Sequence, residues 1–250
     1  MDFYAFLPSN ASPDVYPDNM TSDFKTQLAN RMELHGEWQA ALIEIHYPNT
    51  VANVTEGENQ IIFQTDHVTD IVCVKPGCYP NKKEFLDAIA TALSTFDNNV
   101  RPGKLLEEDA DHHIVLHSIF SSGKMFFSPR LALQLGLDGH GPFRANETLC
   151  GVKPVDISLG IPPQLFIYMD ILSDQIIGHT RAPLLRTLPV DTKAQYGTMS
   201  IVHCDHPIYF DLSTKSFDTI QTYIRDHAGR LLPFEFGTLT LLVHFRKLSR

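Results

Sequence analysis

Histidines are the residues of this sequence with the most obvious capacity for chemistry. The chain has 250 residues, of which 12 are histidines, and the densest group lies in the stretch DHHIVLH at residues 111–117. Alternate side chains of a β-strand share a face, so His113 and His117 could bind Zn²⁺ together with a nearby aspartate, as in a metal-dependent enzyme. A strand face exposed to water explains the same pattern. These two histidines are therefore only candidates, and the sequence assigns no metal ion.

The other reactive residue types form no recognised catalytic pattern. The sequence contains no G-x-S-x-G elbow, no H-E-x-x-H and no Gly-rich phosphate-binding loop. Carboxylates at 107–111 crowd into one loop, as in a solvated turn, and HCDHP at 203–207 fits a strand end before a proline as well as a zinc site. The four cysteines form no C-x-x-C pair, which favours free thiols in a reducing compartment. The sequence predicts a protein that is not an enzyme and needs no cofactor.

Two arginines and the single tryptophan could take part in binding. Arg181 and Arg186 could bind an anion, and a salt bridge at the surface or at a subunit interface is the alternative. Trp38 could be an exposed platform for a ligand, but its position at the start of an apolar strand favours packing in the core. We therefore treat the two arginines as subunit-interface candidates and Trp38 as a core residue.

The composition is that of a globular protein without a basic surface. Hydrophobic residues make up 43% of the chain and charged residues 20%, which suits one large domain or two small ones. The formal net charge of −9 disfavours direct nucleic-acid binding, which usually needs a basic face. No apolar run reaches the roughly 18 residues needed to cross a membrane, and the first residues lack the pattern of a signal peptide. We expect a cytosolic or nuclear protein that is not secreted.

Residues 1–21 are rich in Pro, Asn, Asp and Ser but also contain aromatic side chains. We predict an extended N-terminal arm here, with Phe3, Tyr4 and Phe6 as candidates for docking on a neighbouring subunit. A disordered terminus is the alternative.

Residues 22–140 mix strand and helix patterns, and we predict an α+β part here. A strand begins at Trp38 and stops at Pro48, because proline cannot donate to a sheet. A helix over 82–96 has an apolar stripe and an N-terminal capping box formed by Asn81 and Glu84.

The remainder of the chain favours a β-sandwich. Residues 141–163 hold several Gly and Pro and are expected to be a linking segment. Short strands recur over 164–250, which indicates a jelly roll, and residues 22–74 could belong to the same sandwich. The fold class is therefore mainly β, a jelly-roll β-sandwich with an N-terminal α+β elaboration that contains one clear helix.

The stretch FDTIQTYIRDHAGRLLPFEFGTLTLLVHFR, residues 217–246, contains two runs in which alternate side chains fall on opposite faces of a strand. We predict that the two runs pair as a hairpin around Asp226 and Gly229. The apolar face of the second run is expected to lie in the core; its members are Leu239, Leu241, Val243 and Phe245.

Three segments resemble capsid-associated proteins of Maverick/Polinton elements and the related adintoviruses. They are GEWQAALIEIHYPNT (36–50), LSDQIIGHTRAPLLRTLPV (172–190) and the closing stretch 217–246. CYPNKKEFLDAIATAL (78–93) and the FFSPRLALQLGL that follows it also fit this group. Within it, the chain resembles the minor capsid, or penton, proteins of these virus-like DNA transposons, and it departs from them at Val51, where relatives tend to have an aromatic residue.

This resemblance implies a jelly-roll protein that forms homopentamers at the fivefold vertices of an icosahedral particle. It implies contact with the major capsid protein of the same element, a place in the virion, and assembly in the nucleus or cytoplasm of the host cell. No membrane or nucleic-acid partner is expected. Leu242 lies on the outer face of the last strand and is then a candidate for contact with the next subunit, with ordinary edge packing as the alternative.

A binding module is the alternative function. Jelly rolls also carry ligand and carbohydrate sites, so the fold alone does not decide between a shell protein and a sugar-binding β-sandwich that assembles no shell. The binding module needs an exposed aromatic platform, which Trp38 would have to supply.

Overall fold

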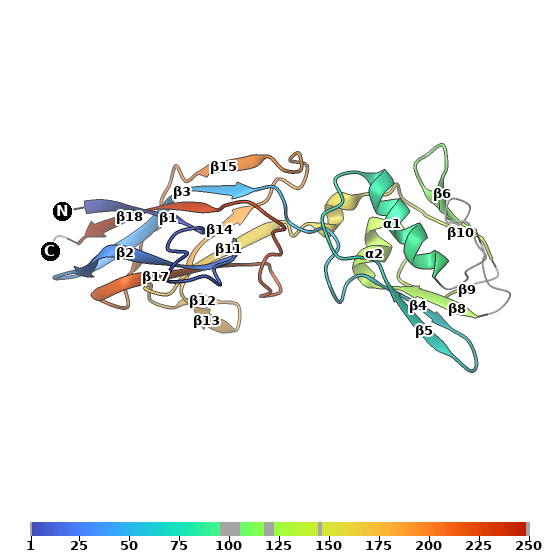
Figure 1. Ribbon diagram of the computed structural model, residues 1–250, viewed down its shortest axis with the longest axis horizontal. Coiled ribbons are helices and arrows are strands. Elements are labelled where there is room, and N and C mark those ends of the chain that lie inside the picture. The colour runs from blue at the N-terminus through green and yellow to red at the C-terminus, as the bar shows by residue number, and fades with distance from the viewer. Residues whose placement is uncertain (1, 96–105, 118–122, 145–146, 249–250) are drawn as a thin grey trace. The chain divides into compact units, whose positions relative to one another are not determined.

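The computed structural model describes residues 2–95, 106–117, 123–144 and 147–248, and it divides into two compact units (Figure 1). Unit 1 comprises Met1–Val51 and Pro162–Arg250, and unit 2 comprises Ala52–Ile161. Unit 2 is therefore an insertion between two segments of unit 1.

Unit 1 is a β-sandwich of two antiparallel sheets. Their strand orders are β1-β18-β3-β15 and β14-β11-β17-β2. Counted along the chain, these eight strands read 1-8-3-6 and 5-4-7-2, which is the strand order of a jelly roll and confirms the predicted fold class. The strands are β1 (Asp2–Pro8), β2 (Asp23–Glu33), β3 (Trp38–Pro48), β11 (Gln164–Met169), β14 (Leu184–Pro189), β15 (Met199–His203), β17 (Ser216–Arg225) and β18 (Thr240–Lys247), with the short β16 (Phe210–Asp211) beside β3 and a separate hairpin of β12 (Gln175–Ile177) and β13 (Thr180–Ala182).

Alternating side chains place one face of each sheet in the core of unit 1. In β18, Leu241, Val243 and Phe245 are fully buried, and the residues between them are partly exposed. They belong to one apolar cluster with inward residues of the second sheet, such as Ile220 and Ile224 of β17. Burying each side chain of this size contributes roughly 1.5–3 kcal/mol, so this cluster is what holds the two sheets together.

The predicted hairpin of residues 217–246 is wrong. β17 pairs with β11 and β2, whereas β18 pairs with β1 and β3, so the two strands lie in opposite sheets. The chain does reverse after β17, where Asp226 receives the backbone N–H of Gly229, but it then crosses to the other sheet before β18 begins. Alternation shows that each strand has one buried face. A hairpin of β17 and β18 and a placement of the two strands in opposite sheets are both compatible with that pattern.

Asp226 holds the turn that follows β17. Its buried carboxylate accepts the backbone N–H groups of Ala228 at 2.8 Å and Arg230 at 2.9 Å, and its other oxygen accepts Nε of Arg230 at 3.0 Å. Burial acts to raise the pKa of this carboxyl, but the hydrogen bonds and charge of Arg230 outweigh it, so the pKa lies below its ordinary value. The ionised form is therefore the one that stabilises the turn.

Replacing Asp226 by asparagine should lower the free energy of unfolding at pH 7 by about 1–3 kcal/mol, because charged hydrogen bonds are lost. Since the folded pKa is depressed, the ionised group stabilises the fold above its ordinary pKa, and this stabilisation is lost as the pH falls through the folded pKa. The difference between wild type and variant should thus shrink in strong acid. Urea titrations followed by Trp38 fluorescence measure the free energy of unfolding of both proteins, and Asp14→Asn at an exposed aspartate is the control. An equal loss in both variants at pH 7 would contradict this role.

The first part of the predicted N-terminal arm, Asp2–Pro8, is in fact a strand of the sandwich. Asp2–Pro8 form β1, an edge strand that pairs with β18 throughout its length. Phe3 stacks on Phe245 with ring centroids 4.7 Å apart, and Leu7 is fully buried. The polar composition after residue 8 suggested an arm. The inward-facing residues of β1 instead anchor this strand to the core.

Unit 2 is an α+β unit with its own apolar cluster. Helix α1 (Lys82–Ser94) and the short α2 (Pro129–Gln134) accompany a four-stranded sheet, a three-stranded sheet and a 3₁₀ turn. Among the residues that the structure describes, no helix is both long and apolar enough to cross a membrane. The remaining elements are β4 (Gln60–Gln64), β5 (Thr69–Cys73), β8 (Lys124–Phe127) and β9 (Phe143–Arg144) in one sheet, β6 (Leu106–Glu108), β7 (Ile114–Leu116) and β10 (Leu149–Cys150) in the other, and η2 (Ile157–Gly160).

Helix α1 begins where its cap was predicted. Asn81 accepts the backbone N–H of Glu84 at 3.0 Å and donates to the Glu84 side chain at 2.7 Å. The apolar stripe of the helix is buried in the cluster of unit 2 through Phe85, Ile89 and Leu93. The helix ends at Ser94, and the predicted last residue, Phe96, lies outside the described residues.

The unit boundaries differ from those expected from composition. The strand ending at Pro48 belongs to unit 1, and the two strands that follow it, up to residue 74, belong to unit 2. Residues 141–163 were expected to be a linker, yet most of them lie in unit 2 and contribute β9, β10 and η2. Gly and Pro mark turns between very short strands there, not a boundary.

Candidate assembly surface

The outward side chains of β1, β18, β3 and β15 form one continuous surface of unit 1, which we call the β1–β15 face. Their registry is set by the antiparallel pairing of the four strands. Because residues directly opposite one another share a face, each row across the sheet contributes one side chain per strand. One row is Phe6, Leu242, Glu44 and His203; the next is Pro8, Thr240, His46 and Ile201.

The β1 side of this face is aromatic. Phe6 is 67% exposed and Tyr4 is 60% exposed, and the Tyr4 ring stacks on His244 of β18 with centroids 4.6 Å apart. Leu242 lies beside Phe6 in the same row and is partly buried. On the β15 side, Ile201 and Met199 are also about half exposed. Strands put these side chains outward because their neighbours in sequence point into the core.

The middle of the face carries a carboxylate between two imidazoles. Glu44 pairs with Nε2 of His46 through one oxygen, and its other oxygen lies 2.6 Å from Nδ1 of His203. The hydrogen bond from His46 is the main reason that the pKa of Glu44 lies below its ordinary value; partial burial opposes it, and His203 lowers it further. Among the described residues, no three His, Cys, Asp or Glu side chains are arranged to bind a metal ion.

The far end of the face carries a hydrogen-bonded polar network. The Arg246 guanidinium lies 3.5 Å from the centre of the Tyr209 ring and donates to Oε1 of Gln39 at 2.8 Å. The Tyr209 hydroxyl is 2.8 Å from Nδ1 of His244, and Gln39 donates to Asp211 at 2.9 Å. Each of these side chains therefore contacts at least one other side chain of the network.

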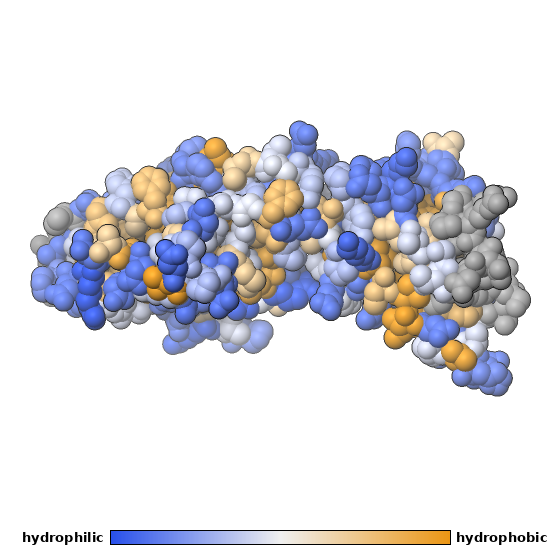
Figure 2. Space-filling view, in the orientation of Figure 1, coloured by the Kyte–Doolittle hydropathy of each residue, from blue (hydrophilic) through white to orange (hydrophobic). Residues whose placement is uncertain are grey.

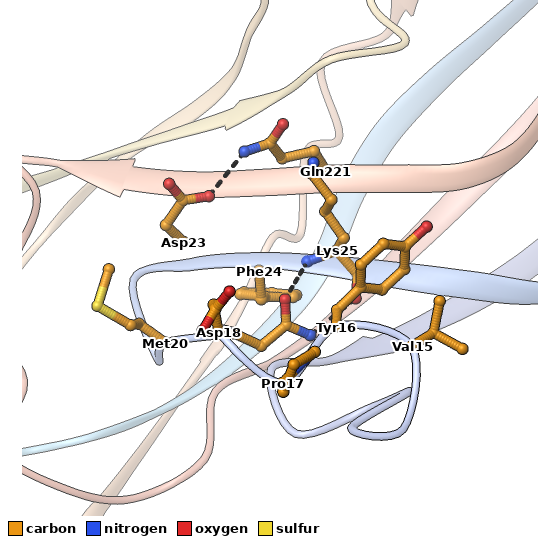
Figure 3. Close-up of a pocket in the computed structure, with 10 residues that line it drawn as sticks. Val15, Tyr16, Pro17, Asp18, Met20, Asp23, Phe24, Lys25 and Gln221 are labelled. Atoms are coloured by element: carbon orange, nitrogen blue, oxygen red, sulfur yellow. Dashed lines mark hydrogen bonds between the residues drawn. The ribbon is translucent and has the colours of Figure 1, made fainter.

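A separate open pocket lies beside the loop between β1 and β2 (Figure 3). Its volume is about 280 Å³, and two hydrogen bonds join residues of its lining: Asp23 accepts Nε2 of Gln221 at 2.8 Å, and the backbone N–H of Lys25 donates to Asn19 at 2.8 Å.

No protein-family model and no curated protein matches the sequence. The crystal structure of the mavirus penton protein aligns with 99% of this chain and 100% of its own length, with a TM-score of 0.56 and 9% sequence identity. This chain shares the fold of the mavirus penton protein. A chain from the cryo-EM structure of the Sputnik virophage aligns over 98% of both chains, with 11% identity and a TM-score of 0.49.

The similarity to the mavirus penton protein extends through both units, because nearly the whole chain is aligned. In this chain, the jelly roll is interrupted by unit 2 between β3 and β11. At 9% identity, this similarity describes the fold and identifies no individual contact residue.

The histidines considered for a metal site are not brought together. His113 lies 3.5 Å from Oδ2 of Asp109, and His117 lies 3.5 Å from Oε2 of Glu107. Each imidazole therefore has its own carboxylate, on or next to the hairpin of β6 and β7.

The two candidate arginines lie on different strands and form no joint anion site. Arg181 is exposed on β13, opposite Ile176, whereas Arg186 on β14 donates to the carbonyl of His206 at 3.3 Å. Of the arm candidates, Phe3 points inward and only Tyr4 and Phe6 face outward.

Trp38 is buried, with 8% of its surface exposed, and its Nε1 donates to the carbonyl of His35 at 3.2 Å. It belongs to the same apolar cluster as Leu239 and the inward residues of β18. An aromatic platform for sugars at this position is therefore excluded.

Sequence reasoning missed most of the β1–β15 face. Glu44 and His46 alternate with buried Ile45 and Tyr47, which is a visible sign of an exposed strand face. What the sequence does not contain is the registry that sets His203 opposite Glu44.

Proposed function

We propose that this chain is a penton-type minor capsid protein of a Maverick/Polinton-like element. It forms homopentamers at the vertices of an icosahedral particle, where the surrounding partner is the major capsid protein, and it resides in the virion. The observation that carries the proposal is the jelly roll with an insertion between β3 and β11, a fold shared with the mavirus penton protein over almost the full length of both chains.

The arrangement of side chains favours an assembly role over a chemical one. The most notable surface of unit 1 combines exposed aromatic residues with a hydrogen-bonded polar border, as the core and rim of protein interfaces do. A carbohydrate-binding role loses its required platform, because Trp38 is in the core.

The solution mass of the purified chain tests the proposal. Light scattering over a concentration series should give a mass near five times 28.2 kDa, because a cyclic head-to-tail contact closes a ring of defined size. The mass should stay constant over at least a tenfold dilution. A stable dimer or trimer, or a single chain at every concentration, would contradict a pentameric vertex protein.

A further inference from the structure

The β1 edge of the β1–β15 face has the aromatic composition of an interface core. An aromatic side chain can bury about 150–250 Å², so Tyr4 and Phe6, more than half exposed, leave on the order of 200 Å² of apolar surface on one edge of the sheet. Single exposed apolar residues are common on soluble proteins, but here they are grouped by strand pairing around Leu242. Hydrophobic residues also reach the surface among hydrophilic ones over the strands of unit 1 in the space-filling view (Figure 2).

The polar part of the face is organised before any partner arrives. Glu44 is held by two histidines, and Arg246 is held by Tyr209 and Gln39. Side chains that already hold one another lose little conformational entropy when a partner binds. The free-energy cost of binding at this face is therefore reduced.

We infer that the β1–β15 face receives a second copy of this chain, with Tyr4, Phe6 and Leu242 as the apolar anchor and Ile201 at the opposite edge. The inference rests on the proposed function, in which each subunit must contact two neighbouring copies. In a head-to-tail ring, one of these contacts uses this face and the other uses a different surface of the same chain.

The chemistry of the face selects a protein partner. Asp2, Glu44 and Asp211 share the face with Arg246 and His203, so it lacks the basic patch that a nucleic acid or an anionic membrane needs. The size is also appropriate. Four strands about 4.8 Å apart, with an average of about eight residues each, project on the order of 500 Å². The relief of the side chains brings the accessible area closer to the roughly 800 Å² per partner of a stable interface.

Two substitutions on the face and one matched control test the inference. Ile201→Glu and Phe6→Glu place a charge at each edge of the face. Ile71→Glu makes the same change at an isoleucine that is 55% exposed on strand β5 of unit 2, compared with 53% for Ile201. Because all three residues are exposed, each variant should retain its fold, which circular dichroism and thermal unfolding check. Sedimentation velocity over a dilution series then gives the dissociation constant of the assembly.

We expect both face variants to dissociate at roughly 100-fold or more higher concentrations than wild type, since a buried unpaired charge is costly at an interface. Ile71→Glu should assemble as wild type does. Hydrogen exchange of the β1 and β15 amides should also slow when the wild-type protein assembles.

Three results would overturn the inference. If wild type and both face variants assemble equally well, copies meet elsewhere and the proposed function stands without this face. If Ile71→Glu is impaired as strongly as Ile201→Glu, the face has no special role. If wild type itself never assembles, the proposed function fails, and the docking of a second copy fails with it.

Discussion

Replacing Leu7 by alanine is expected to lower the free energy of unfolding of unit 1 by about 2–5 kcal/mol. Leu7 comes from the edge strand β1, yet none of its side chain is exposed, and it packs in the cluster that joins the two sheets. Removing its branched end leaves a cavity that the edge of the sheet can close only in part. Deletion of residues 2–8 would also remove the Phe3 contacts with Trp38 and Phe245, and should abolish cooperative folding of unit 1.

The neighbouring residue supplies the control. Phe6→Ala removes a larger side chain from the same strand, but Phe6 is two-thirds exposed, so the change in stability should be within about 0.5 kcal/mol. Trp38 is the only tryptophan and lies in unit 1, so its fluorescence during urea unfolding reports on this unit. Equal, small effects of both substitutions would mean that β1 is a detachable arm after all.

Most strands of unit 1 other than β1 were visible in the sequence because each has one buried face. Leu239, Leu241, Val243 and Phe245 are fully buried, and they alternate with the outward-facing Thr240, Leu242 and His244. Membership of a sheet is a different kind of information. It depends on contacts between residues far apart in the chain, such as the pairing of Phe245 with both Phe3 and Ala40, and the local pattern is the same whether β18 joins β17 or β1 and β3.

Helix α1 was predictable for the opposite reason, since the signals that define its start are local. Asn81 and Glu84 are three residues apart and cap the first turn by themselves. The limits of the inserted unit were less accessible, because nothing in the composition near Val51 or Ile161 distinguishes a unit boundary from a turn.

The β1–β15 face depends both on the local sequence pattern and on the pairing of strands that lie far apart in the chain. Exposed positions such as Glu44 and His46 follow from alternation, and Leu242 was recognised as an outward residue on that basis. Their arrangement into one face with Tyr4 and Ile201 needs four strands from three distant parts of the chain. The residues that make up such a face can be identified only when the strand order of the jelly roll is known.

Replacing Gly136 by alanine should destabilise unit 2 by at least about 3 kcal/mol. Gly136 follows α2 with φ +69°, a conformation that costs other residues about 1–2 kcal/mol, and it ends the helix as glycine commonly does. A Cβ at this position would also lie 2.0 Å from the carbonyl oxygen of Lys153, which is backbone and cannot rotate away. That carbonyl belongs to a segment held by Gly136 itself, whose oxygen accepts the N–H groups of Val152 and Lys153. Relieving the clash therefore breaks these hydrogen bonds.

Gly139→Ala separates the two causes. Gly139 has φ +78°, but an added Cβ there would have no atom within 4 Å, so this variant carries the backbone strain without the clash and should lose only about 1 kcal/mol. Hydrogen exchange of the α1 amides reports on unit 2, while Trp38 fluorescence reports on unit 1. Gly136→Ala should accelerate exchange in α1 by at least about 100-fold and leave the Trp38 transition in place. Equal exchange rates in the two variants would show that backbone strain at positive φ accounts for the whole loss of stability. The backbone near Lys153 would then move away from the added Cβ in spite of its hydrogen bonds to Gly136.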